Sequence, residues 1–77
     1  MTDMEELINT AYAEGTEDWN KVKWYNEDPD EDIQQIWIQR FTKNVSVTIF
    51  RKNDHLTCLR GKMIRGKIKN LKVTCEE

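Results

Sequence analysis

Residues 33–51 read IQQIWIQRFTKNVSVTIFR, and the rest of the chain is predicted to fold around this stretch. Apolar and polar residues alternate in both of its halves, as they do in strands that bury one face. The halves are joined by Thr42, Lys43 and Asn44, and asparagine tolerates the positive φ of a hairpin turn. We therefore expect a β-hairpin whose connection is residues 42–44.

The two faces of this hairpin differ in chemistry. One face is aliphatic, and the other carries aromatic and polar side chains. The aliphatic residues are Ile36, Ile38, Val45, Val47 and Ile49, and the opposite ones are Trp37, Gln39, Phe41, Ser46, Thr48 and Phe50. We expect the aliphatic face to pack on a helix. We expect Trp19, Trp24 and Tyr25 to cover the aromatic face, because seven aromatic residues in a small protein need burial. The alternative is an exposed platform for stacking.

An amphipathic helix is predicted at the N-terminus. Thr2 and Glu5 match a capping box, and Gly15 is suited to a left-handed helix end. One helical face is apolar, formed by Met4, Leu7, Ile8, Ala11 and Tyr12. The pattern predicts a helix over residues 3–14.

Further strands are predicted at residues 21–25, 55–59 and 70–75, with a turn at Asn53 and Asp54. Cys58 and Cys75 fall at apolar positions of this pattern, where reduced cysteine is a small core residue. The fold class is therefore α+β: one N-terminal helix packed on a small antiparallel meander of about four strands, in a single domain of residues 1–77.

Charge is unevenly distributed along the chain, although the net charge is only −2. Residues 1–36 contain eleven acids and two bases, whereas residues 37–77 contain ten bases and three acids. Such asymmetry indicates a charged partner. The other interpretation is that the two halves neutralise each other in the fold.

Several classes of function are disfavoured by composition. The chain has one histidine, one serine and two cysteines, and His55 and Cys58 would face opposite sides of a strand. Metal ligands are too few for a zinc site, and no glycine cluster could cradle a phosphate. The N-terminus lacks the basic and apolar regions of a signal peptide, and no apolar run could span a membrane. We expect a cytoplasmic, non-enzymatic protein without catalytic, cofactor or metal sites.

Our first hypothesis is a small inhibitor or regulator that occupies a basic, possibly nucleic-acid-binding, surface of a larger protein. In size and charge the chain is like small phage and mobile-element proteins. Carboxylates of the N-terminal half would mimic backbone phosphates. The predicted contact residues are Glu14, Glu17, Asp18, Glu27, Asp28, Asp30, Glu31 and Asp32.

The alternative hypothesis is a nucleic-acid-binding protein that uses its basic C-terminal sheet. The run RGKMIRGK at residues 60–67 could dock on phosphates or could protect an exposed edge strand. The predicted contact residues are Arg60, Lys62, Arg65, Lys67 and Lys69 for phosphates and Trp37 and Phe50 for bases. A third possibility is a homo-oligomer that covers the aromatic face, and the sequence leaves the oligomeric state open.

Overall fold

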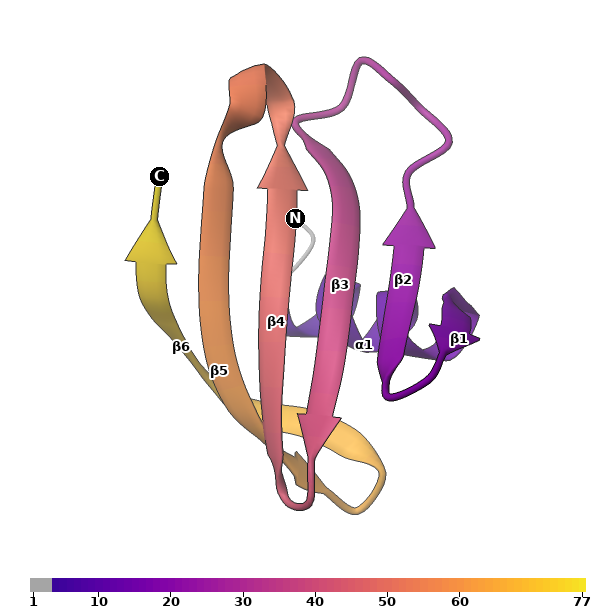
Figure 1. Cartoon of the computed structure of the whole chain (residues 1–77), viewed down its shortest axis with the longest axis vertical. Coiled ribbons are helices and arrows are strands. Elements are labelled where there is room, and N and C mark those ends of the chain that lie inside the picture. Colours follow the sequence, from indigo (N-terminus) through magenta and orange to yellow (C-terminus); the bar gives the residue numbers. More distant parts are fainter. Residues whose placement is uncertain (1–3) are drawn as a thin grey trace.

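One helix covers one face of a six-stranded antiparallel sheet in the computed structural model, which describes residues 4–77 (Figure 1). The elements are α1 (Met4–Glu14), β1 (Thr16–Asp18), β2 (Lys21–Tyr25), β3 (Ile33–Phe41), β4 (Asn44–Arg51), a 3-10 turn η1 (Lys52–Asp54), β5 (Leu56–Ile64) and β6 (Lys67–Glu76). The spatial order of the strands follows the chain, so the predicted α+β meander is confirmed. The predicted number of about four strands is wrong.

The strand that no sequence pattern predicted is β1, which reads Thr-Glu-Asp and is fully exposed. It has no apolar residue that could signal a strand, and it is held only by pairing with β2. The strand predicted at residues 21–25 is confirmed as β2, whereas those predicted at 55–59 and 70–75 extend further as β5 and β6.

The central hairpin forms as predicted, with Ile36 opposite Ile49 and Ile38 opposite Val47. Its connection is shorter than expected, because Asn44 already pairs with Phe41 as the first residue of β4. The positive φ of the turn falls on Thr42, at 50°, and not on asparagine.

The core lies between α1 and the aliphatic face of the sheet. Its buried residues are Ile8, Ala11, Ile36, Ile38, Val45, Val47, Ile49, Leu59 and Ile68. The far end of the β5–β6 hairpin curls behind the sheet toward the helix (Figure 1), so α1 contacts β6 as well as β2 and β3. The expectation that the aliphatic face packs on the helix is confirmed.

A side-chain amide fastens α1 to β6. The Asn9 Oδ1 accepts a hydrogen bond from the Ile68 backbone N–H at 2.8 Å, and Asn9 Nδ2 donates to the Ile68 carbonyl at 3.0 Å. Asn9 therefore pairs with the backbone of an edge strand as another strand would.

Gly15 ends the helix for a reason that differs from the predicted one. Its φ is not positive, but a Cβ atom there would lie 2.5 Å from Val22 Cγ1 and 2.7 Å from the Ala11 carbonyl oxygen. Close approach of β2, and not a left-handed conformation, requires glycine here. The predicted capping box includes Thr2, which lies outside the described residues.

Across residues 4–77, no helix has both the length and the apolar character needed to cross a membrane.

Candidate nucleic-acid interface

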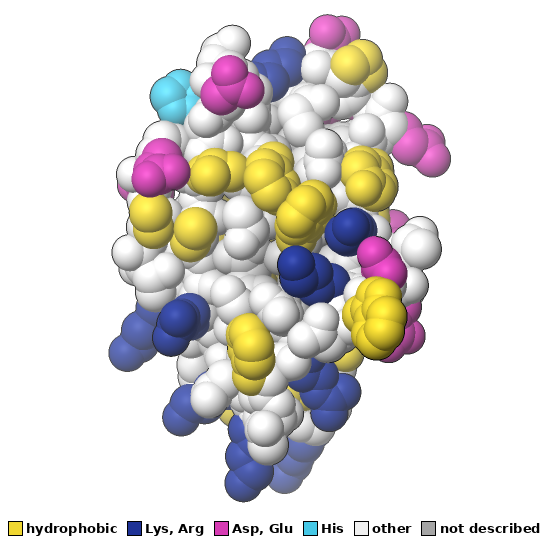
Figure 2. Space-filling model, viewed as in Figure 1, with side chains coloured by type: hydrophobic (Ala, Val, Ile, Leu, Met, Phe, Trp, Pro, Cys, Tyr) yellow, Lys and Arg dark blue, Asp and Glu magenta, His cyan; other side chains and the backbone are white. Residues whose placement is uncertain are grey.

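The face of the sheet turned away from α1 is left uncovered by the described part of the chain (Figure 2). We call it the open face, and strand alternation and register assign its residues. They are Lys21, Lys23, Tyr25, Gln35, Trp37, Gln39, Phe41, Asn44, Ser46, Thr48, Phe50, Leu56, Cys58, Arg60, Lys62, Lys72 and Cys75.

The prediction that three aromatic residues cover this face is wrong. Trp24 lies on the helix side and packs against the core. Trp19 is in the β1–β2 turn and is 94% exposed, while Tyr25 is 55% exposed at the end of β2. Trp24 is thus half-buried against the core, and neither Trp19 nor Tyr25 covers the aromatic face.

Trp37 and Phe50 form the centre of the open face. Their ring centroids are 4.9 Å apart in an edge-to-face arrangement. Lys23 and Lys21 extend from β2 over the indole, with Nζ atoms 4.8 Å and 5.6 Å from the centroid of the Trp37 ring. The indole N–H donates to Gln35 Oε1 at 3.1 Å. Trp37 is thus half-buried, fixed in orientation and flanked by two cations.

Two shallow hollows of about 420 and 610 Å³ lie side by side beyond this aromatic centre. They share Asn44, Arg60 and Gly61. Phe41, 51% exposed, borders the smaller hollow, and Lys72 borders the larger one. An aromatic ring and several cations therefore line one continuous depression.

Like charges face each other across β5 and β6. Arg60 is the cross-strand partner of Lys72, and Lys62 is the partner of Lys69. Such pairs destabilise a sheet, and Lys69 is compensated by an ion pair with Glu5 at 3.0 Å. No ion pair with a carboxylate is seen for Arg60 or Lys72 within residues 4–77. An anionic ligand would relieve the repulsion between them.

Strands β2, β3, β4 and β5 contain no aspartate or glutamate, although the chain has fourteen acids. The acids of the described residues lie in α1, β1, the connections and the C-terminal end of β6. In Figure 2 the basic side chains gather toward the lower end of this face, and the acidic ones lie along its upper end and one side. Separate charged surfaces therefore form, joined by a few ion pairs.

The structure brings together part of the predicted nucleic-acid-binding set. Arg60, Lys62, Trp37 and Phe50 share the open face. Arg65 and Lys67 lie at the tip of the β5–β6 hairpin, which is tied to the β3–β4 turn by a hydrogen bond from the Met63 N–H to the Lys43 carbonyl at 2.9 Å. Lys69 is held on the helix side by Glu5.

Sequence reasoning placed Phe41 on the same face as Trp37 and Phe50, but it missed Lys21, Lys23 and Lys72 as members of this surface. For Lys72 the signal was its alternation with Leu71 and Val73, whereas its position beside Arg60 depends on pairing between strands.

The predicted protein-binding acids fall into two groups. Glu14, Glu17 and Asp18 lie at the end of α1 and in β1, whereas residues 27–32 form the β2–β3 loop at the opposite end of β2 (Figure 1). Asp18 pairs with Lys23 at 3.5 Å. The two groups are therefore separated by the length of β2.

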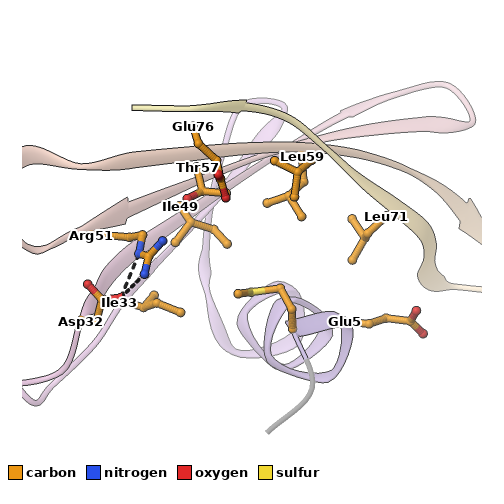
Figure 3. Close-up of a pocket in the computed structure, with 11 residues that line it drawn as sticks. Glu5, Asp32, Ile33, Ile49, Arg51, Thr57, Leu59, Leu71 and Glu76 are labelled. Atoms are coloured by element: carbon orange, nitrogen blue, oxygen red, sulfur yellow. Dashed lines mark hydrogen bonds and ion pairs between the residues drawn. The ribbon is translucent and has the colours of Figure 1, made fainter.

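Asp32 is also engaged within the fold. Its Oδ2 accepts hydrogen bonds from Arg51 Nε at 2.8 Å and Arg51 Nη2 at 2.5 Å (Figure 3). These hydrogen bonds, with the charge of the guanidinium, lower the pKa of Asp32. Asp32 therefore anchors the β2–β3 loop to the end of β4.

The rest of this loop is ordered by its own side chains. Asn26 Oδ1 accepts from the Asp28 N–H, and Asp28 Oδ1 accepts from the Asp30 N–H, both at 3.0 Å. Gln34 donates to the Pro29 and Glu31 carbonyls. The exposed carboxylates are consequently presented on a structured loop.

A third hollow, of about 530 Å³, lies between α1 and the opposite face of the sheet (Figure 3). Ile33, Ile49, Leu59 and Leu71 line it, and the Asp32–Arg51 pair is at its rim. Arg51 is already bonded to Asp32, so this hollow offers a ligand mainly apolar contact.

Comparison of the chain with protein-family models, curated proteins and solved structures finds no match. Its function is therefore argued from the geometry of its surfaces.

Proposed function

We propose that this protein binds single-stranded nucleic acid across the open face. The observation that carries the proposal is the absence of acidic residues from the four strands β2, β3, β4 and β5 themselves, whose open face exposes aromatic rings and unneutralised bases. A carboxylate-free surface in a chain with fourteen acids favours a polyanionic ligand.

Phosphates would contact Arg60, Lys62 and Lys72, which border the two hollows. Bases would stack on Phe41, whose ring is exposed, and against the edge of the Trp37–Phe50 pair. A single strand fits better than a duplex because only unpaired bases can reach aromatic rings on a sheet.

Acidic residues at both ends of β2 would limit the length of strand that binds. The β2–β3 loop and β1 would repel phosphates beyond the central strands. Because the net charge is −2, we expect modest affinity that falls steeply as salt rises.

Fluorescence anisotropy of a labelled oligothymidylate tests the proposal. Binding at low salt should weaken with added salt, and Arg60→Gln with Lys72→Gln should reduce the slope of log K against log salt by about 1.4, because each lost phosphate contact on a single strand contributes about 0.7. The matched control is Arg40→Gln with Lys52→Gln, which removes the same charge away from the open face.

Equal loss of binding in both double variants would show that only net charge matters. No anisotropy change at low salt, or tighter binding to duplex than to single strand, would also contradict the proposal.

As a second candidate, we propose binding to a basic surface of another protein through the acidic edge at β1. A specific observation favours it: Trp19 is 94% exposed and has a φ of 58°. A positive φ is unfavourable for a bulky residue, and exposed tryptophan beside Glu17 and Asp18 is typical of an interface anchor. Almost all of this side chain is in contact with solvent and not with the fold.

Capture from nuclease-treated lysate by the immobilised chain tests this candidate. Trp19→Asn should lose the captured protein while the free energy of unfolding rises by about 1 kcal/mol, because asparagine accepts a positive φ. Capture that is undiminished in Trp19→Asn, or in a Glu17→Gln, Asp18→Asn variant, would contradict it.

A further inference from the structure

Cys58 and Cys75 are direct cross-strand partners in β5 and β6, and both are free thiols. The sequence pattern predicted them as core residues, and this is wrong: both lie on the open face, with Cys58 half-buried and Cys75 exposed. The register shift next to Cys58 turns Cys75 away from the core, although Leu71 and Val73 precede it at alternating positions.

The register places the two thiols opposite each other, and, besides desolvation, a hydrogen bond with Cys58 is among the causes of the raised pKa of Cys75. Leu56 and Glu77 exchange both of their N–H···O bonds at 2.8 Å, which makes them a hydrogen-bonded pair. Hydrogen-bonded and non-hydrogen-bonded pairs alternate along an antiparallel ladder. Cys58 lies two residues after Leu56, and Cys75 lies two residues before Glu77, so they are also a hydrogen-bonded pair. The Cα atoms of such a pair are about 5.5 Å apart. Disulfides typically join residues whose Cα atoms are about 5.5–6 Å apart and whose Cβ atoms are about 3.5–4.5 Å apart. Closure therefore needs the two Cβ atoms to approach by about 1 Å from the regular cross-strand spacing.

The register at this point is held by a further contact, because the Thr74 hydroxyl donates to the Cys58 carbonyl at 3.3 Å.

We propose that Cys58 and Cys75 form a redox-active dithiol, which closes to an intrachain disulfide on reaction with a small disulfide such as glutathione disulfide. This reaction does not require nucleic-acid binding, although both cysteines belong to the open face.

The reaction proceeds by two thiol–disulfide exchanges. The thiolate of the exposed Cys75 attacks one sulfur of glutathione disulfide and releases a glutathione thiolate, which leaves a mixed disulfide. The thiolate of Cys58 then attacks the Cys75 sulfur and releases the second glutathione. Two protein thiols and one glutathione disulfide give one protein disulfide and two glutathione molecules, with the thiol protons passing to the leaving thiolates through solvent.

The surroundings of Cys75 slow its first step at neutral pH. Desolvation by its neighbours raises the pKa of Cys75, and the adjacent Cys58 on β5 and the carboxylates of Glu77 and Glu76 raise it further. Thiolate is the attacking species, so the rate of oxidation should rise as the pH increases toward this raised pKa.

The Cys58–Cys75 disulfide would stabilise β6, a strand with few buried side chains. β6 is an edge strand in which only Ile68 is buried, and like charges oppose it at Lys72 and Lys69. A disulfide at Cys75 would fasten the end of β6 that lies far from Ile68. Backbone amides near Cys75 should then exchange with deuterium more slowly in the oxidised form.

The test is mass spectrometry of the whole chain after incubation in glutathione buffers of increasing oxidised fraction, with acid quenching and alkylation of the remaining thiols. Both thiols should be lost together, the mass should fall by two hydrogen atoms, and no glutathione should be retained. Cys58→Ser and Cys58→Ala should each stop at a glutathione adduct on Cys75.

The same titration in urea supplies the reference for an unconstrained chain. The equilibrium constant for formation of the Cys58–Cys75 disulfide should be on the order of 100-fold larger in the folded protein than in the unfolded one. This ratio is expected because the disulfide closes a loop of about 15 residues, which restricts the unfolded chain. Stable glutathione adducts on both cysteines, disulfide-linked dimers, or a folded-state constant no larger than the unfolded one would overturn the proposal.

Discussion

At the scale of single residues, Gly15 and Gly66 are both glycine for different physical reasons. Gly15 has no space for a Cβ atom beside Val22. Gly66, in the β5–β6 turn, has a φ of 81° and no atom within 4 Å of the position of a Cβ. One site is limited by packing, and the other by backbone conformation.

Gly15→Ala should therefore lower the free energy of unfolding by about 2 kcal/mol, the usual effect of overpacking. Gly66→Ala should lower it by about 1 kcal/mol through backbone strain, and Gly66→Asn by less, because asparagine tolerates a positive φ. Urea denaturation measures all three. Full stability of Gly15→Ala would show that α1 and β2 are further apart than described.

The ion pair between Asp32 and Arg51 gives a pH-dependent signature. The pKa of Asp32 is lowered below its ordinary value of 3.8, first by the hydrogen bonds from Arg51. A carboxyl whose folded-state pKa is lowered stabilises the fold above its unfolded pKa, and this contribution is lost as the pH falls through the folded-state value. Both side chains are exposed, so the contribution is small.

An NMR titration of the Asp32 carboxyl carbon should place its midpoint below 3.8 in the natural chain. Arg51→Gln should raise the midpoint toward the ordinary value, whereas Lys52→Gln, with the same charge change, should have a smaller effect. A midpoint that Arg51→Gln does not move would show that the pair is not formed in solution.

At the scale of elements, the strength of periodicity determines what could be predicted. The central hairpin and α1 combine regular alternation or helical spacing with buried aliphatic residues, and both were predicted with the correct faces. β1 has no apolar residue, and the register shifts in β6 move Cys75 onto the opposite face. These features depend on pairing between strands, which a local pattern does not encode.

The contact between α1 and β6 also could not be predicted, because it joins residues far apart in the chain. Asn9→Ala should lower the free energy of unfolding by about 2 kcal/mol, since it leaves the Ile68 N–H and carbonyl without partners. Urea denaturation and hydrogen exchange at the Ile68 amide measure the effect. Thr10→Ala, at an exposed neighbouring position, is the control, and equal stability of the two variants would contradict this role for Asn9.

At the scale of the whole molecule, the charge asymmetry of the sequence becomes a separation in space. Carboxylates occupy the β2–β3 loop and β1, and the central strands between these regions are free of acids. The sequence indicated both charged sets, but their arrangement depended on the fold. The error about aromatic coverage mattered most for function, because it had made an uncovered sheet face less probable than a closed one.

The three tryptophans allow one measurement to test the central claim, that the open face binds single-stranded nucleic acid. Each indole N–H gives its own signal in a ¹⁵N-correlated NMR spectrum: Trp37 reports on the open face, Trp24 on the helix side and Trp19 on the acidic edge. Addition of an oligothymidylate at low salt should shift the Trp37 signal strongly and leave those of Trp24 and Trp19 in place. An unchanged Trp37 signal, or a shift confined to Trp19, would contradict the account.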